Sequence, residues 1–197
     1  MNATRAPLVA LTLTALLSWP VAAEDKPRAP TSAVRNPIDV DPHGYLHRIQ
    51  LPPGFSISIY TDEVPGARSM ALGNAGTVFV GTRTDGNWQT LGKVYAVTDR
   101  DRDGNPERVI TLAEGLNMPN GVAVHDGDLY VAEIDKVIRY RDIENTLDSP
   151  PTPDVIGGSF PNERHHGWKY IAFGPDGRLY VPVGAPCNIC ETKPELG

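Results

Sequence analysis

The densest group of titratable side chains in the sequence is the segment Arg164-His165-His166-Gly167-Trp168-Lys169-Tyr170. A histidine gains and loses a proton near neutral pH, so it can act as a general base where its side chain faces a channel. Two adjacent histidines can equally cap a strand or bond to backbone groups. The residue types therefore leave two roles open for His165 and His166, a catalytic base and a structural histidine.

The run Asp99-Arg100-Asp101-Arg102-Asp103-Gly104-Asn105-Pro106-Glu107 is the second segment with distinctive chemistry. Its carboxylates at Asp99, Asp101 and Asp103 alternate before a glycine, as in calcium loops, because Ca²⁺ takes about six to eight oxygen ligands. An EF-hand has a glutamate at its twelfth position, where this chain has Ile110. An EF-hand is therefore not expected, and the alternatives are a different calcium site and a polar turn in which Arg balances Asp.

The elements that position these segments are predicted from a pattern that occurs three times, at 70–81, 121–132 and 170–182. Each copy has an alternating apolar strand, a turn closed by glycine and a second apolar strand, which is typical of a β-hairpin. The turn glycines Gly76, Gly127 and Gly177 are 51 and 50 residues apart. This period predicts an all-β fold, a β-propeller of four-stranded blades.

Two further strands are expected at 93–97 and 136–140, as outer strands of the first two blades. About three blades are expected in residues 45–197, whereas a propeller needs about four to eight blades to close. We therefore expect the N-terminal half of a longer propeller, six-bladed when complete, with 24–44 as an extended lead-in.

The N-terminus has the features of a secretory leader. A basic start is followed by an apolar stretch from Leu8 to Leu17 and by small residues at Val21-Ala22-Ala23, which predicts a signal peptide at 1–23. The stretch is too short for a membrane span of about 20 residues and is interrupted by Pro20. The mature chain is expected to be periplasmic or secreted, with no membrane span.

The composition excludes one class of partner and favours a local crosslink. The formal net charge is −6, and no basic run is present, so a nucleic-acid partner is not expected. Cys187 and Cys190 are the chain's two cysteines, and in an exported protein a local disulfide is the simplest interpretation. Haem attachment would need a histidine where Glu191 stands.

The string from His166 to Gly184, His-Gly-Trp-Lys-Tyr-Ile-Ala-Phe-Gly-Pro-Asp-Gly-Arg-Leu-Tyr-Val-Pro-Val-Gly, resembles the segment of the soluble quinoprotein sugar dehydrogenases that carries their catalytic histidine. Further phrases are similar to the sorbosone dehydrogenase branch: Leu51-Pro-Pro-Gly-Phe55, Ala67-Arg-Ser-Met-Ala-Leu72, Val80-Gly-Thr-Arg83, Gly92-Lys-Val-Tyr95 and Met118-Pro-Asn-Gly121. The resemblance covers roughly residues 45–192. After Gly184 the glucose-oxidising branch would have Asp, and this chain has Ala185.

The resemblance implies that pyrroloquinoline quinone accepts a hydride from C1 of a sugar or sugar aldehyde, while His166 removes the hydroxyl proton. The cofactor carries three carboxylates, which guanidinium groups bind well, so Arg68 and Arg83 are candidate cofactor-binding residues. Asn120 precedes the second hairpin as Arg68 precedes the first, and we expect these positions to converge at one end of the channel. The resemblance also implies a calcium ion at the cofactor and a periplasmic electron acceptor such as a cytochrome c.

Two alternative functions stay open from the sequence. The hairpin from Asn120 to Ala132 is also similar to strands of calcium-dependent lactonase-like propellers, in which channel carboxylates would hold the metal. A propeller can also be a binding module without catalysis, because fold alone does not define function.

Overall fold

The computed structural model describes residues 44–84, 91–185 and 187–189. All of them belong to one compact unit, residues 31–197. The predicted signal peptide at 1–23 and almost all of the lead-in at 24–44 lie outside the described residues. Within the described part, no helix has the length and apolar character needed to cross a membrane.

The first sheet contains β1 (Ala67–Leu72), β2 (Thr77–Thr82), β3 (Gly92–Thr98) and β4 (Arg108–Leu116). The strands pair antiparallel in chain order, and β2 and β3 are the most buried because they lie in the middle of the sheet. Gly76 closes the β1–β2 turn with a φ of +85°, and a Cβ there would lie 2.3 Å from the Asp99 carbonyl oxygen. Only glycine fits this turn, so the repeated glycine has a steric cause.

The second sheet repeats the arrangement with β5 (Gly121–His125), β6 (Asp128–Ala132), β7 (Lys136–Tyr140) and β8 (Asp154–Gly158). Its first turn is the two-residue link Asp126-Gly127, with φ values of +49° and +84°. Two left-handed residues in a two-residue hairpin match the right-handed twist of the flanking strands, and Asp-Gly is a preferred pair for that geometry.

The third hairpin consists of β9 (Ala172–Phe173) and β10 (Leu179–Tyr180). These strands are much shorter than the pattern at 170–182 predicts. The apolar alternation is present, and Leu179 and Val181 pack against a cluster of the second sheet. Tyr180 is 57% exposed and Val183 is 51% exposed, so this part of the hairpin is only partly covered in the described structure. The sequence pattern shows the periodicity of apolar side chains, whereas a strand also needs a neighbouring strand to which its backbone is hydrogen-bonded.

Outside the strands, the described part has two short 3₁₀ helices, η2 (Leu46–Arg48) and η3 (Ile143–Asn145). The expected strands at 93–97 and 136–140 are confirmed as β3 and β7. They are third in their sheets, and the outermost strands β4 and β8 were not predicted. On β8, Val155 is 64% exposed, so its residues lack the alternation that marks the inner strands.

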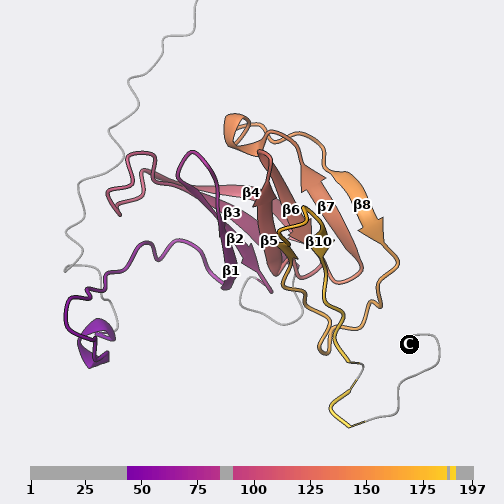
Figure 1. Cartoon of the computed structure of the whole chain (residues 1–197), viewed down its shortest axis with the longest axis horizontal. Coiled ribbons are helices and arrows are strands. Elements are labelled where there is room, and N and C mark those ends of the chain that lie inside the picture. Colours follow the sequence, from indigo (N-terminus) through magenta and orange to yellow (C-terminus); the bar gives the residue numbers. More distant parts are fainter. Residues whose placement is uncertain (1–43, 85–90, 186, 190–197) are drawn as a thin grey trace, which may run out of the picture. The chain divides into compact units, whose positions relative to one another are not determined.

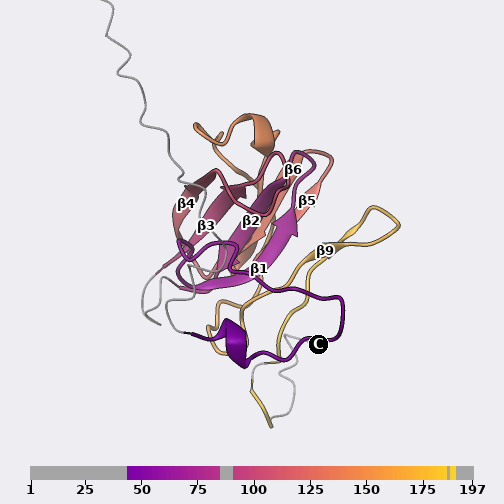
Figure 2. The same cartoon turned by 90° about the vertical axis from the view of Figure 1, so that its left-hand side faces the viewer.

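The first strands of the three hairpins lie next to one another, because β1 contacts β5 and β5 contacts β9 (Figures 1 and 2). This is the arrangement of inner strands in neighbouring propeller blades. The largest apolar cluster fills the space between the two four-stranded sheets. It contains Phe79, Val94, Ala96, Leu112, Val122, Leu129, Val131, Ile138, Tyr140, Ile143 and Leu147. The all-β prediction is confirmed, with two four-stranded blades and a third hairpin described.

Candidate functional site

A tight turn in the segment between β8 and β9 carries His166. The Gly167 N–H donates to the Arg164 carbonyl oxygen at 3.4 Å, and a Cβ at Gly167 would lie 1.9 Å from the Glu163 carbonyl oxygen. His166 itself has a φ of +56°, in the left-handed region that costs an L-residue about 1–2 kcal/mol. A non-glycine residue held in this conformation is typical of sites where geometry serves a function.

The imidazole of His166 has a defined hydrogen bond. Its Nδ1 lies 3.2 Å from the Ala185 carbonyl oxygen, and the ring stacks on His165 with centroids 3.9 Å apart. A carbonyl oxygen can only accept, so Nδ1 carries the proton of the neutral ring and Nε2 presents a lone pair. Gly184 permits this approach, because a Cβ there would lie 2.0 Å from the His166 carbonyl oxygen.

Arg83, one of the two predicted cofactor-binding arginines, lies on the tryptophan next to this histidine. The Cζ of Arg83 lies 4.0 Å from the centre of the Trp168 ring, and the same ring meets His166 edge to face at 6.4 Å. Burial lowers the pKa of the Arg83 guanidinium, and the positive charge of Arg68 lowers it further. Arg68 and Arg83 therefore form one electropositive pair, and the Trp168 ring lies between Arg83 and His166.

Asn120, the third predicted cofactor-binding residue, is 5% exposed. Its side-chain Nδ2 donates to the Lys169 carbonyl oxygen at 2.7 Å, and its backbone carbonyl accepts a hydrogen bond from the Ser69 hydroxyl. Buried hydrogen bonds thus join Ser69, Asn120 and Lys169. These bonds give Asn120 a structural role between blades, while its contact with a cofactor stays a prediction.

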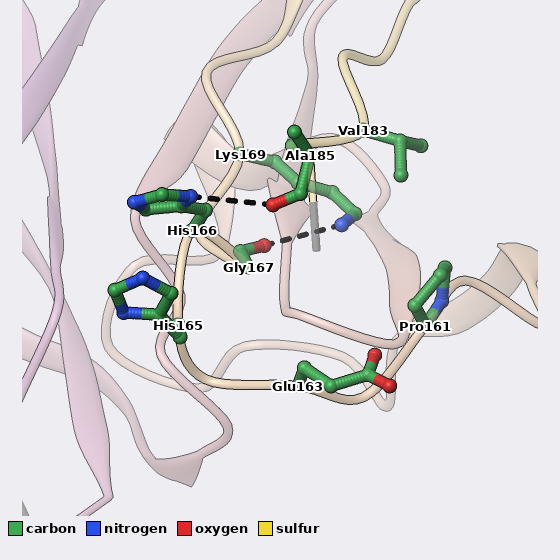
Figure 3. A pocket seen from close by; sticks show the side chains of 9 residues that line it. Pro161, Glu163, His165, His166, Gly167, Lys169, Val183 and Ala185 are labelled. Atoms are coloured by element: carbon green, nitrogen blue, oxygen red, sulfur yellow. Dashed lines mark hydrogen bonds between the residues drawn. The ribbon is translucent and has the colours of Figure 1, made fainter. Parts of the chain in front are cut away.

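A small hollow with a cavity volume of about 20 Å³ lies beside His166 (Figure 3). Its lining consists of Pro161, Glu163, His165, His166, Gly167, Lys169, Val183, Gly184 and Ala185. Lys169 is 1% exposed, and burial lowers the pKa of its ammonium group, an effect that the charge of Asp135 partly offsets. The hollow therefore combines the His166 imidazole, a buried cation and the carboxylate of Glu163.

The predicted metal residues lie elsewhere. Oxygens of Asp99, Asp101 and Glu107 come within 4.8 Å of one another, whereas the Asp103 carboxylate accepts a hydrogen bond from the Asn105 N–H at 2.7 Å. The Asp99 N–H donates to the Gly76 carbonyl oxygen, which places this loop at the turn end of the first blade, away from Arg83. Any ion held here would not contact the His166 hollow.

Sequence reasoning missed Glu107, Glu163, Trp168 and Lys169 as site residues. Trp168 and Lys169 stand inside the segment already singled out, and their type was a usable signal, because a lysine in an apolar strand entry is unusual. Glu107 closes the acidic run eight positions after Asp99. For Glu163 the sequence carries no signal, since an exposed glutamate in a loop is ordinary.

Cys187 is disulfide-bonded, two positions after Ala185, whose carbonyl accepts from His166. Its predicted partner, Cys190, lies outside the described residues. The disulfide places a covalent constraint close to the segment that orients the imidazole.

Comparison with protein families assigns the chain to one of them. The chain belongs to the family described as a domain of unknown function (DUF7133), whose model matches residues 41–194. No curated protein matches the chain.

Three solved structures are similar. The holo form of the pyranose dehydrogenase PQQ domain from Coprinopsis cinerea is 16% identical with a TM-score of 0.53, over 64% of this chain and 30% of that chain. A protein from Thermus thermophilus described as a putative oxidoreductase (glucose dehydrogenase) is 22% identical, with a TM-score of 0.47 over 64% and 39%. A gluconolactonase from Xanthomonas campestris is 17% identical, with a TM-score of 0.44 over 61% and 36%.

The first of these likenesses supports the β-propeller fold. This chain spans about a third of the length of the solved structures, between 30% and 39%. The site chemistry must therefore be argued from the chain's own residues.

Proposed function

We propose that this chain forms part of an exported quinoprotein dehydrogenase that oxidises a sugar or sugar aldehyde, with His166 as the general base. The observation that carries the proposal is the orientation of the imidazole. Its Nδ1–H is held by the Ala185 carbonyl oxygen at 3.2 Å, so Nε2 is available to take the hydroxyl proton of a substrate.

The residues around His166 fit a cofactor with carboxylates. Pyrroloquinoline quinone needs cationic donors, and Arg68 and Arg83 supply two guanidinium groups close enough to influence each other. The Trp168 ring under Arg83 fixes that side chain at a centroid distance of 4.0 Å. When bound, the quinone would supply the two-electron acceptor for the hydride that leaves the carbon bearing the hydroxyl.

The chain's own residues then have distinct tasks. His166 takes the proton at Nε2 as the carbon–hydrogen bond breaks, and the Ala185 carbonyl stabilises the imidazolium because it still accepts from Nδ1. Arg68 and Arg83 would hold the acceptor, and the substrate would leave as a carbonyl compound that has lost two electrons and two protons. Export by the predicted leader at 1–23 to the periplasm or medium, and electron delivery to an acceptor such as a cytochrome c, complete the proposal.

A lactonase-like hydrolase would hold its metal through carboxylates in the channel. Among the described residues, the one group of three carboxylates is Asp99, Asp101 and Glu107, at the turn end of the first blade. The position of this group therefore gives no support to metal-assisted hydrolysis at His166.

The test of the dehydrogenase is quinone-dependent dye reduction by the complete natural polypeptide that carries residues 1–197, with His166→Asn. Asparagine tolerates a left-handed backbone but cannot act as a base, so we expect kcat to fall about 10²–10⁴-fold. His165→Asn is the matched control, because the structure gives its ring stacking contacts but no carbonyl partner. Equal losses in the two variants would contradict the assignment of the base, and failure of the unmodified protein to bind the quinone would reject the proposal.

Calcium at the acidic loop is a separate part of the proposal. The Oε2 atom of Glu107 is buried and has no hydrogen-bond partner among the described residues, and Asp99 and Asp101 offer oxygens beside it. We expect calcium at about a hundred times its Kd to stabilise the chain by about 2.7 kcal/mol, measured by thermal unfolding.

Glu107→Gln should abolish this calcium-dependent shift in melting temperature. Asp103→Asn should keep most of it, since Asp103 stands outside the group of three. A shift that survives Glu107→Gln, or no shift in the unmodified chain, would reject the site.

A further inference from the structure

Lys169 differs from the other buried charged side chains of the described structure. Glu133, 3% exposed, accepts from the Lys136 ammonium at 2.9 Å and from the Asn117 N–H at 2.5 Å. Lys169, 1% exposed, donates to the Gly167 carbonyl oxygen at 3.2 Å, and its Nζ lies 5.0 Å from the Phe160 ring centre. No carboxylate within the described ranges lies within ion-pair distance of it.

An ammonium group has three hydrogens to donate, and burying a charge without compensation costs several kcal/mol. One carbonyl and one aromatic ring satisfy the Lys169 ammonium only in part. In Figure 3 its side chain ends inside the ring of residues that line the hollow, near Gly167 and Val183. The Lys169 ammonium therefore has hydrogens left to donate, and it lies in the wall of the hollow that His166 also lines.

We propose that the hollow is a subsite for a carboxylate group, with Lys169 as its cation. A carboxylate is the partner that a buried ammonium binds most strongly, through a short charge-assisted hydrogen bond. Two molecules carry that chemistry here, an acidic sugar and the quinone. The inference rests on the proposed function for the identity of these ligands, while the subsite itself rests on the geometry around Lys169.

Glu163 provides an internal check on this assignment. It lines the same hollow and is an exposed loop residue, so its negative charge repels an incoming carboxylate. If the hollow instead bound the hydroxyl groups of a neutral sugar, the Glu163 carboxylate would be a useful acceptor. Removing its charge should thus strengthen binding of a carboxylate and weaken binding of a neutral sugar.

The experiment is isothermal titration calorimetry of the full chain at pH 7 and low ionic strength, with D-glucuronate, D-glucose and pyrroloquinoline quinone titrated separately. Low ionic strength limits screening of charges at the rim. We expect Lys169→Met to weaken the carboxylate ligand about tenfold or more, the loss of one charge-assisted hydrogen bond. Glu163→Gln should tighten the same ligand a few-fold.

Methionine has a similar length and needs no partner, and Glu163 is exposed, so both variants should fold; circular dichroism checks this. Unchanged carboxylate affinity in Lys169→Met would overturn the subsite. Preferred binding of D-glucose, weakened by Glu163→Gln, would also overturn it and identify a hydroxyl site. Binding of D-glucuronate but not of the quinone would support the subsite while rejecting the quinone function, so the two failures are distinguishable.

Discussion

The two junctions between neighbouring hairpins of this molecule are built differently. The first junction, between the β1–β4 and β5–β8 sheets, is filled by the large apolar cluster that includes Phe79 and Ile143. The second junction, between the β5–β8 sheet and the segment from Phe160 to Tyr180, has a smaller cluster around Ala123 and Ile171. The segment that forms this second junction also carries the buried Lys169 and, together with Val183, Gly184 and Ala185, lines the His166 hollow.

The ends of the first junction are closed by hydrogen bonds between side chains and backbone groups. At the turn end, the Glu144 carboxylate in η3 accepts from the Ala75 N–H at 3.0 and 3.1 Å. At the other end, the Ser69 hydroxyl donates to the Asn120 carbonyl. The comparison teaches that the first junction supports the fold, whereas the second accepts less apolar burial and holds polar groups that can do chemistry.

The largest expected effect on stability comes from the first junction. Glu144→Ala removes the acceptor of the β1–β2 turn amides, and we expect a loss of about 1–2 kcal/mol in the free energy of unfolding, measured by urea denaturation. Glu163→Ala is the matched control in the second junction, with an expected change within about 0.5 kcal/mol. If the control destabilises as much as Glu144→Ala, the division between the junctions is wrong.

Lys169→Met tests the second junction directly, because it removes a buried charge from that junction. At pH 7 we expect an unfolding temperature above that of the unmodified chain. The pKa of Lys169 is lowered by burial, so between that value and its ordinary pKa the unfolded chain binds more protons. Between the lowered pKa of Lys169 and its ordinary value, the free energy of unfolding of the unmodified chain therefore rises with pH.

The advantage of Lys169→Met should accordingly shrink as the pH rises through that window. Burial raises the pKa of Tyr140, but this contribution is common to both proteins and cancels in the difference. Thermal unfolding at a series of alkaline pH values measures the trend, and a constant or growing difference would count against a partly compensated lysine.

The smallest expected effect concerns the backbone of His166. At its φ of +56°, His166→Gly should be more stable than His166→Ala by about 1 kcal/mol. At His165, which is not among the residues with positive φ, the order should reverse because glycine loses more entropy on folding. Urea denaturation of the four variants decides this, and the same order at both positions would remove the case for strain.

Part of the fold followed from local patterns. Gly76, Gly127 and Gly177 marked the three turns because their positive φ values are a local demand that only the sequence at that point can satisfy. The outer strands β4 and β8 escaped prediction, since their faces are partly exposed and their residues lack a strict alternation. The short β9 and β10 show the reverse case, because the apolar pattern is longer than the two residue pairs that are hydrogen-bonded as strands.

The candidate site also has a part that the sequence predicted and a part that it did not. The sequence by itself determined the hairpin repeat and singled out the segment around His166, because turn glycines, apolar alternation and clustered titratable side chains are all visible along the chain. Only the tertiary structure decided that Asn120 is used between blades, that Glu107 rather than Asp103 joins the acidic group, and that Lys169 is buried at the hollow. Hydrogen-bond partners and burial depend on which segments meet in space, and no periodicity along the chain encodes them.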